Sequence, residues 1–236
     1  MKKNILFGMM ILAAGPLLAA DSSPKDDVKA AATALGDQAN YSWHTSVESP
    51  NGGGRFNAPT DGKTEKGGYT MLSMTRGDNT IEAVLKGTNG AIKTPDNGWQ
   101  SLAEATQDNG GGFNPATFLV RLGQNFKSPA DQAASLAGQA KDLTAGTNGI
   151  SGDLTEEGAK QLLLFRRGGN SSVSDAKGSI TFWLADGKLT KYQTHVTGTV
   201  SFNGNDRDVD RTTTTEIKDV GSTKVEVPDD AKKKLQ

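Results

Sequence analysis

The sequence predicts an α+β fold in which an antiparallel sheet is interrupted by helices that cover one of its faces. Runs typical of β-strands, separated by turn dipeptides, occupy both halves of the chain. Segments typical of helices stand before the first half and between the two halves. This order of elements defines the α+β class. If the strands curl strongly, the helices fill the concave side of the sheet.

The clearest strand signals lie in the last third of the chain. Asp186-Gly187 separates residues 180–184 from 189–202, and Asn203-Gly204 separates that run from 208–218. Both dipeptides favour the type I′ turn of a tight hairpin, because each central residue tolerates a positive φ. Alternation along the middle run predicts one buried and one wet face. The side chains expected to point inward there include Val196, Val200 and Phe202.

Weaker strand signals occur in the first half and at the C-terminal end. We expect these strands at residues 41–48, 69–76, 80–86, 91–94, 99–102 and 224–227. The glycine-rich stretches 51–54 and 109–112 are expected to be loops.

Four helices are predicted from their start signals and apolar spacing. Ser23-Pro24 and Ser128-Pro129 each place a capping serine before a proline at the first helical position. The first of these helices should end at Gly36. A third helix, 114–126, would align Phe118, Leu122 and Phe126 in one stripe, and a fourth runs over about 155–167.

The N-terminus has the pattern of a signal peptide. We assign residues 1–20 to this signal peptide and residues 21–236 to one mature domain. Lys2 and Lys3 precede an apolar run that is too short to span a ~30 Å hydrocarbon core, and Ala19-Ala20 fit a cleavage site. No later stretch is apolar for long enough to be an integral membrane segment. We therefore expect a soluble periplasmic protein, with secretion to the medium as the alternative.

Composition argues against several classes of partner and modification. The chain has no cysteine, which excludes both disulfides and a lipid-modified N-terminal cysteine. Without Lys2 and Lys3, the 26 basic residues become 24 against 27 acidic ones, a net charge near −3. Nucleic-acid binding requires a basic face. The one basic cluster, Lys232-Lys233-Lys234, is better explained as the end of a short terminal helix.

The sequence predicts neither a catalytic site nor a metal or cofactor site. Nucleophile-elbow and phosphate-binding motifs are absent. His44 and His195 fall on the polar faces of predicted strands. Asp206, Asp208 and Asp210 alternate along a strand, but Arg211 stands where a calcium loop requires glycine. Paired carboxylates of a hydrolase are recognised by their separation in space, so that alternative stays open.

Aromatic residues are the better indication of a ligand site. An aromatic helix that faces a curved sheet would enclose an apolar cavity, the usual form of a site for hydrophobic ligands, although an ordinary core has the same pattern. The residues expected to line this cavity are Trp43, Met71, Trp99, Phe118, Leu122, Phe126, Phe182 and Trp183.

The chain resembles the LolA-like superfamily of periplasmic lipoprotein and lipid carriers, which includes LppX/LprG-type carriers and RseB-type stress sensors. A strand with Trp183 followed by Asp186-Gly187 and a second strand is similar to a recurring element of that family. So are Gly152-x-Leu154-Thr155-x-Glu157 and the ending 215–221, followed by 225–228 and Ala231. The resemblance implies an unclosed half-barrel whose inserted helices form a lid over an apolar cavity.

The resemblance also implies a function: a non-enzymatic carrier or sensor of acyl-chain ligands, with an envelope protein as donor or acceptor. The lipoprotein carriers hold their lid with an arginine on a strand, and no arginine of this chain aligns with it; Arg55 and Arg76 are named only as candidates. The resemblance therefore implies binding of a lipid or other hydrophobic ligand rather than lipoprotein transfer as such. Two alternatives remain open. One is an envelope hydrolase with dispersed carboxylates, and the other is a protein–protein interaction module.

Export is directly testable. We predict that the mature protein begins near Asp21, because Ala19-Ala20 present small residues to the signal peptidase. N-terminal sequencing of protein from a periplasmic extract should find this new terminus. An intact Met1 in that extract would exclude the signal peptide.

Overall fold

The computed structural model describes residues 22–50, 58–76, 78–94, 97–107, 126–164, 171–202 and 204–235. The predicted signal peptide, both glycine-rich stretches and residues 114–125 of the predicted third helix lie outside these ranges.

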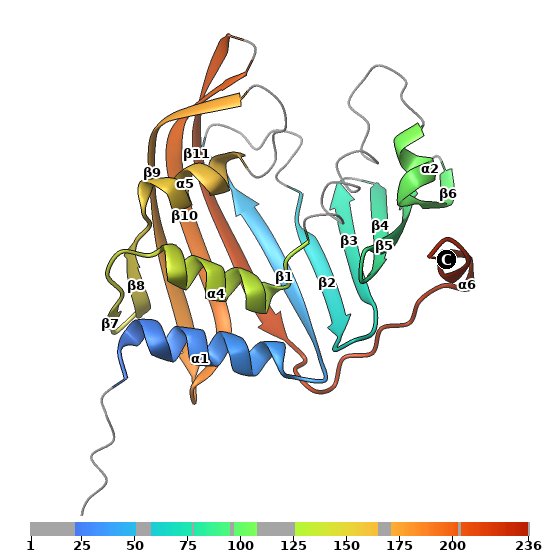
Figure 1. The fold of residues 1–236 in the computed structure, drawn as a ribbon, viewed down its shortest axis with the longest axis horizontal. Coiled ribbons are helices and arrows are strands. Elements are labelled where there is room, and N and C mark those ends of the chain that lie inside the picture. Colours follow the sequence, from blue (N-terminus) through green and yellow to red (C-terminus); the bar gives the residue numbers. More distant parts are fainter. Residues whose placement is uncertain are drawn as a thin grey trace, which may run out of the picture.

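The described strands form one antiparallel sheet of eleven strands, in the order β6-β5-β4-β3-β2-β1-β11-β10-β9-β8-β7 (Figure 1). The first six strands follow one another outward from the middle of the sheet, and the last five return inward to it. The sheet is unclosed, because β6 and β7 form its two edges. The strands of the first group are β1 (Asn40–Glu48), β2 (Thr60–Glu65), β3 (Thr70–Arg76), β4 (Asn79–Lys86), β5 (Asn89–Thr94) and β6 (Asn97–Ser101). Those of the second are β7 (Thr144–Gly146), β8 (Gly149–Asp153), β9 (Ser171–Ala185), β10 (Lys188–Phe202) and β11 (Asn205–Lys218).

Three helices lie on the concave face of this sheet. Figure 1 shows α1 (Pro24–Gly36), α4 (Pro129–Gln139) and α5 (Glu156–Leu164) crossing in front of β9, β10, β11 and β1. The helix α1 packs beside α4 and contacts β10, while α5 contacts β9 and β10. The side chains of α1 that face this core are Val28, Ala31, Ala32 and Leu35. The predicted class, a half-barrel with helices on one face, is confirmed.

The sequence signals for α1 and α4 act as expected. Ser23 Oγ accepts a hydrogen bond from the Asp26 amide at 3.2 Å, and Ser128 Oγ accepts one from the Asp131 amide at 3.1 Å. Each bond satisfies a backbone donor that the first helical turn leaves without an intrahelical partner.

A second, smaller core lies on the convex face. The chain leaves β11, passes to the other half of the sheet and ends in α6 (Asp229–Lys233), which lies beside β5 and β6 (Figure 1). Asn89 Nδ2 donates to the Leu235 carbonyl at 3.0 Å and fixes this end of the chain. The buried residues of the second core are Val84, Ala91, Val227, Ala231 and Leu235.

Several details differ from the predictions. The strand at 224–227 is wrong: this segment is irregular, and the Val225 amide donates to Glu65 Oε1 at 3.0 Å instead of to a neighbouring strand. Phe202 was expected to point inward but is 41% exposed, because it lies at the β10–β11 hairpin tip. The elements that the sequence did not predict are β2, β7, β8 and the short helix α2 (Leu102–Gln107).

No helix in the described ranges has the length and apolar character needed to cross a bilayer.

Candidate functional site

A cavity of about 240 Å³ lies between the helices α4 and α5 and the concave face of the sheet, and we call it the central cavity. Five strands, β3, β2, β1, β11 and β10, contribute to its floor. It is centred on the pairing of β1 with β11, where the two groups of strands meet. Its lining residues are Trp43, Thr45, Thr60, Leu72, Met74, Phe126, Lys127, Pro129, Gln132, Ser135, Leu136, Gln139, Gln161, Leu162, Tyr192, Thr194, Arg211, Thr213 and Thr215.

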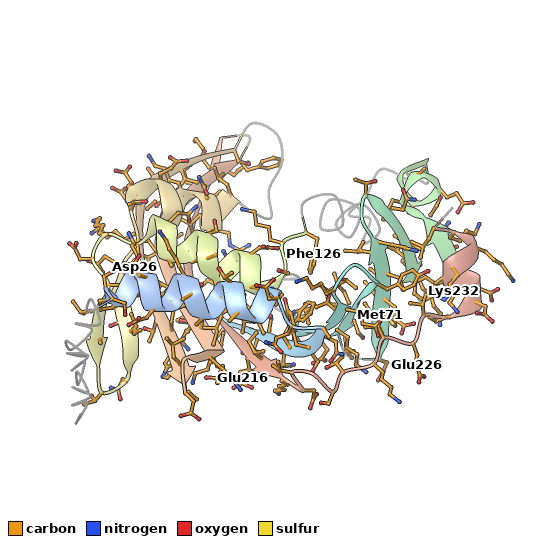
Figure 2. The ribbon with its side chains drawn as sticks, turned by 60° about the horizontal axis from the view of Figure 1, so that its bottom comes forward. Asp26, Met71, Phe126, Glu216, Glu226 and Lys232 are labelled. Carbon is orange, nitrogen blue, oxygen red and sulfur yellow. The ribbon has the colours of Figure 1, made fainter. Side chains whose placement is uncertain are left out.

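Two stacked aromatic rings form one wall of the cavity. The rings of Trp43 and Phe126 have centroids 6.1 Å apart and an interplanar angle of 27°. Trp43 comes from β1, and Phe126 lies on the segment that leads into α4 (Figure 2). The indole of Trp43 lies over Gly62 of β2, where a Cβ would be only 2.0 Å from the ring. Glycine at 62 is therefore required for the position of Trp43.

Threonine hydroxyls form much of the cavity floor. Thr45 and Thr215 are directly opposite each other on β1 and β11, and their Oγ1 atoms are 3.0 Å apart, within hydrogen-bond distance. Thr60 pairs with Thr45 on one side, and Thr213 pairs with Thr194 on the other. The floor is therefore polar but uncharged in the middle of the sheet.

Tyr192 attaches α4 to the sheet. Its hydroxyl donates a hydrogen bond of 2.7 Å to Gln132 Oε1 of α4. Burial raises the pKa of Tyr192 well above its usual range, against the smaller lowering effect of a hydrogen bond with Thr215. The phenol therefore keeps its proton at physiological pH and stays a donor to Gln132.

Arg211 attaches α5 in a comparable way. Its Nη2 donates to the Leu162 carbonyl near the end of α5 at 2.6 Å. The helix also packs closely on β10, where a Cβ on Gly198 would be 2.8 Å from Leu163 Cδ1. Sequence analysis named Arg55 and Arg76 for the lid-holding role, but Arg55 lies outside the described residues and Arg76 ends β3. The available signal for Arg211 was a cation directly before the threonine run of β11.

Among the predicted lining residues that the structure describes, two border this cavity. Trp43 and Phe126 belong to its lining, whereas Phe118 and Leu122 lie outside the described residues. Phe182 is fully buried in the main core and has its ring centroid 6.4 Å from that of Tyr192. Whether any of these residues binds a ligand stays a prediction.

Met71, Trp99 and Trp183 lie on the opposite, convex face. Met71 and Trp99 pack against the second core, and Figure 2 shows Met71 in the half of the sheet that carries α6. Trp183 follows Phe182 on β9, so alternation turns it away from the main core, and Lys191 Nζ lies 4.0 Å from its ring centroid. Sequence alternation identified strands here but not which face pointed inward.

The histidines also lie on the convex face. His44 Nδ1 is 2.7 Å from Asp61 Oδ1, and His195 Nε2 is 2.9 Å from Asp210 Oδ1. In the described part of the chain, no three histidine, aspartate or glutamate side chains gather closely enough to hold a metal ion.

No protein-family model and no curated protein matches the sequence. Its fold is similar to that of the lipoprotein LppX from Mycobacterium tuberculosis, with a TM-score of 0.50, 11% identity, and coverage of 89% of this chain and 100% of that one. LprF from Mycobacterium bovis gives a TM-score of 0.47 at 12% identity, covering 88% of this chain and 97% of that one. A LolA superfamily protein from Nitrosomonas europaea gives 0.31 at 8%, covering 89% and 96%.

The likeness to LppX confirms the fold that the sequence resemblance implied. The chain has the fold of LppX: an open antiparallel half-barrel with helices on its concave face. At 11% identity this likeness concerns the fold alone.

The close approach of Gly62 to Trp43 gives a testable prediction about the cavity wall. In Gly62→Ala the new methyl group must displace the indole, and overpacking of this kind costs roughly 1–3 kcal/mol. We expect a lower urea midpoint and a changed tryptophan emission spectrum.

Gly98→Ala on β6 is the matched control, because a Cβ there meets no atom within 4 Å. It should unfold within about 0.5 kcal/mol of the wild type. Equal stability of the two variants would contradict the packing of Trp43 on Gly62.

Proposed function

We propose that this protein is an exported, non-enzymatic carrier or sensor that binds an acyl chain or a similar hydrophobic ligand in the central cavity. The observation that carries the proposal is the cavity itself, which lies where the helices cover the sheet. Its volume of about 240 Å³ exceeds the roughly 150 Å³ that suffices for a benzene-sized ligand. It is smaller than the ~300–1,000 Å³ of most drug-sized sites, which fits one chain segment.

Hydrophobic transfer supplies the driving force in this proposal. Each methylene that leaves water contributes roughly 0.8 kcal/mol, so eight buried methylenes would contribute about 6 kcal/mol before the costs of association. The ring faces of Trp43 and Phe126 and the side chains of Leu72, Met74 and Leu136 offer the apolar contact surface.

The attachments of the helices make opening of the cavity feasible. Gln139 Nε2 of α4 donates to Gln161 Oε1 of α5 at 2.7 Å, and both side chains lie on the cavity lining. This bond is polar and exposed, so water can replace it at low cost. An entering chain would separate Phe126 from Trp43 and move the start of α4, while Tyr192 and Arg211 keep the helices attached.

The sequence resemblance to the LolA-like carriers and the predicted signal peptide support a role in the periplasm. A lipoprotein or lipid donor and an acceptor in the envelope would complete such a cycle. The rival hydrolase gains no support at this site, because the described lining residues include no aspartate or glutamate.

Replacement of Phe126 by aspartate tests the proposed binding. A carboxylate in the apolar wall must lose its hydration when a chain binds, which opposes binding. We expect Phe126→Asp to abolish uptake of a fluorescent fatty acid, measured by fluorescence titration. Phe202→Asp is the matched control, because Phe202 is an exposed phenylalanine outside the cavity lining, and it should bind the probe like the wild type.

Circular dichroism must show that both variants fold. A folded Phe126→Asp variant with unchanged uptake would show that the ligand does not bind in this cavity. A wild type that never binds the probe, or one that turns over substrates in a hydrolase panel, would contradict the carrier proposal itself.

A further inference from the structure

We propose that the ligand of the central cavity carries a hydroxyl group on its chain, and that Thr194 and Thr213 bind this group. This inference rests on the proposed function and adds the chemical class of the ligand, a hydroxylated acyl chain. It follows from the position and the hydrogen bonding of the threonine side chains on the cavity floor.

The strand register places Thr194 and Thr213 beyond the apolar end of the floor. At that end Trp43 of β1 is opposite Ile217 of β11. Four residues earlier on β11, Thr213 is opposite Thr194 of β10, and both threonines belong to the cavity lining. The two positions on β11 are about 14 Å apart at the usual rise of an antiparallel strand. A chain whose apolar tail lies against Trp43 can therefore extend to this threonine pair.

The pair differs in its hydrogen bonding from the neighbouring threonine pair of the floor. Thr45 and Thr215 are also directly opposite each other, and their Oγ1 atoms are 3.0 Å apart, so each hydroxyl has a partner. Thr194 and Thr213 make no such bond, and neither hydroxyl has another hydrogen-bond partner in the part of the chain that the structure describes. Both hydroxyls are therefore available to a ligand.

Burial makes the unpaired hydroxyl of Thr194 sensitive to what fills the cavity. Thr194 is only 6% exposed, and the surface that it keeps borders the cavity. A buried hydroxyl without a partner is unfavourable, because it has lost its hydrogen bonds to water. A plain hydrocarbon chain would leave it in that state. A ligand with a hydroxyl at this row would satisfy it.

An alcohol matches the chemistry of two facing threonines. Each threonine hydroxyl can donate one hydrogen bond and accept others, and so can a hydroxyl of the ligand. Directly opposite residues have Cβ atoms about 4.5–5.5 Å apart, so one ligand oxygen can donate to one threonine and accept from the other. A site that binds a hydroxyl in this way discriminates against the analogue that lacks it, because its own polar groups are then left unpaired.

Paired ligands that differ by one hydroxyl test this inference. Methyl 3-hydroxydodecanoate and methyl dodecanoate are both uncharged, and each should displace a fluorescent fatty acid from the wild type. We expect the hydroxylated ester to bind about tenfold more tightly, as the net effect of its hydrogen bonds.

Substitutions of Thr194 separate hydrogen bonding from packing. Thr194→Val removes the hydroxyl but keeps a β-branched side chain, so the preference should fall to within about threefold while the plain ester binds at least as tightly as before. Thr194→Ser keeps the hydroxyl and should retain the preference. If Thr194→Val does not fold, Thr213→Val tests the same expectation, because it removes the other hydroxyl of the pair.

Thr212→Val is the matched control, because Thr212 lies on β11 but outside the cavity lining, and its preference should equal that of the wild type. Circular dichroism must show that each variant folds. Equal affinity of both esters for the wild type would overturn the hydroxylated class while leaving the carrier proposal standing. Equal weakening of both esters in a folded Thr194→Val variant would also overturn it, because Thr194 would then act only through packing. Failure of both esters to bind the wild type would instead contradict the carrier proposal.

Discussion

The pairing of β1 with β11 is the interaction on which the rest of the structure depends. Seven residue pairs, from Ser42 with Lys218 to Glu48 with Thr212, join strands from opposite ends of the chain. Thr45 and Thr215, for example, are 170 residues apart in the sequence. The entropic cost of closing a loop grows only slowly with its length. The large sequence separation therefore adds little to the free-energy cost of pairing β1 with β11. Without it, two separate meanders would remain, each with one more open edge.

The central cavity is a consequence of this pairing. The register places the apolar row at Trp43, the hydroxyl rows at Thr45, Thr213 and Thr215, and the cation at Arg211 on neighbouring strands. The helices α4 and α5 then cover the junction, each attached by one side chain of the second meander. The same strands that hold the fold together therefore form the surface on which we propose a ligand binds.

Local chemistry made part of this fold predictable from the sequence. The Asp186-Gly187 turn and the serine caps of α1 and α4 involve residues close in sequence, and each was placed correctly. The strand β2 was missed because its sequence, TDGKTE, has no apolar alternation. Its glycine, Gly62, leaves room for the Trp43 ring, a long-range contact that the local sequence does not reveal. Of the cavity, Trp43 and Phe126 were foreseen, but the threonine floor and Arg211 depend on the long-range register. Met71 and Trp99 looked equally apolar, yet they serve a second core under α6.

Hydrogen exchange with and without dodecanoate tests the central claim, that a fixed β1–β11 junction supports a cavity with movable helices above it. The account predicts that amides of β1 and β11 exchange among the slowest in the chain and are unaffected by ligand, while amides at the start of α4 and near the end of α5 become slower when ligand is added. Junction amides that exchange as fast as those of the edge strand β7, or ligand protection confined to α6 on the convex face, would contradict it.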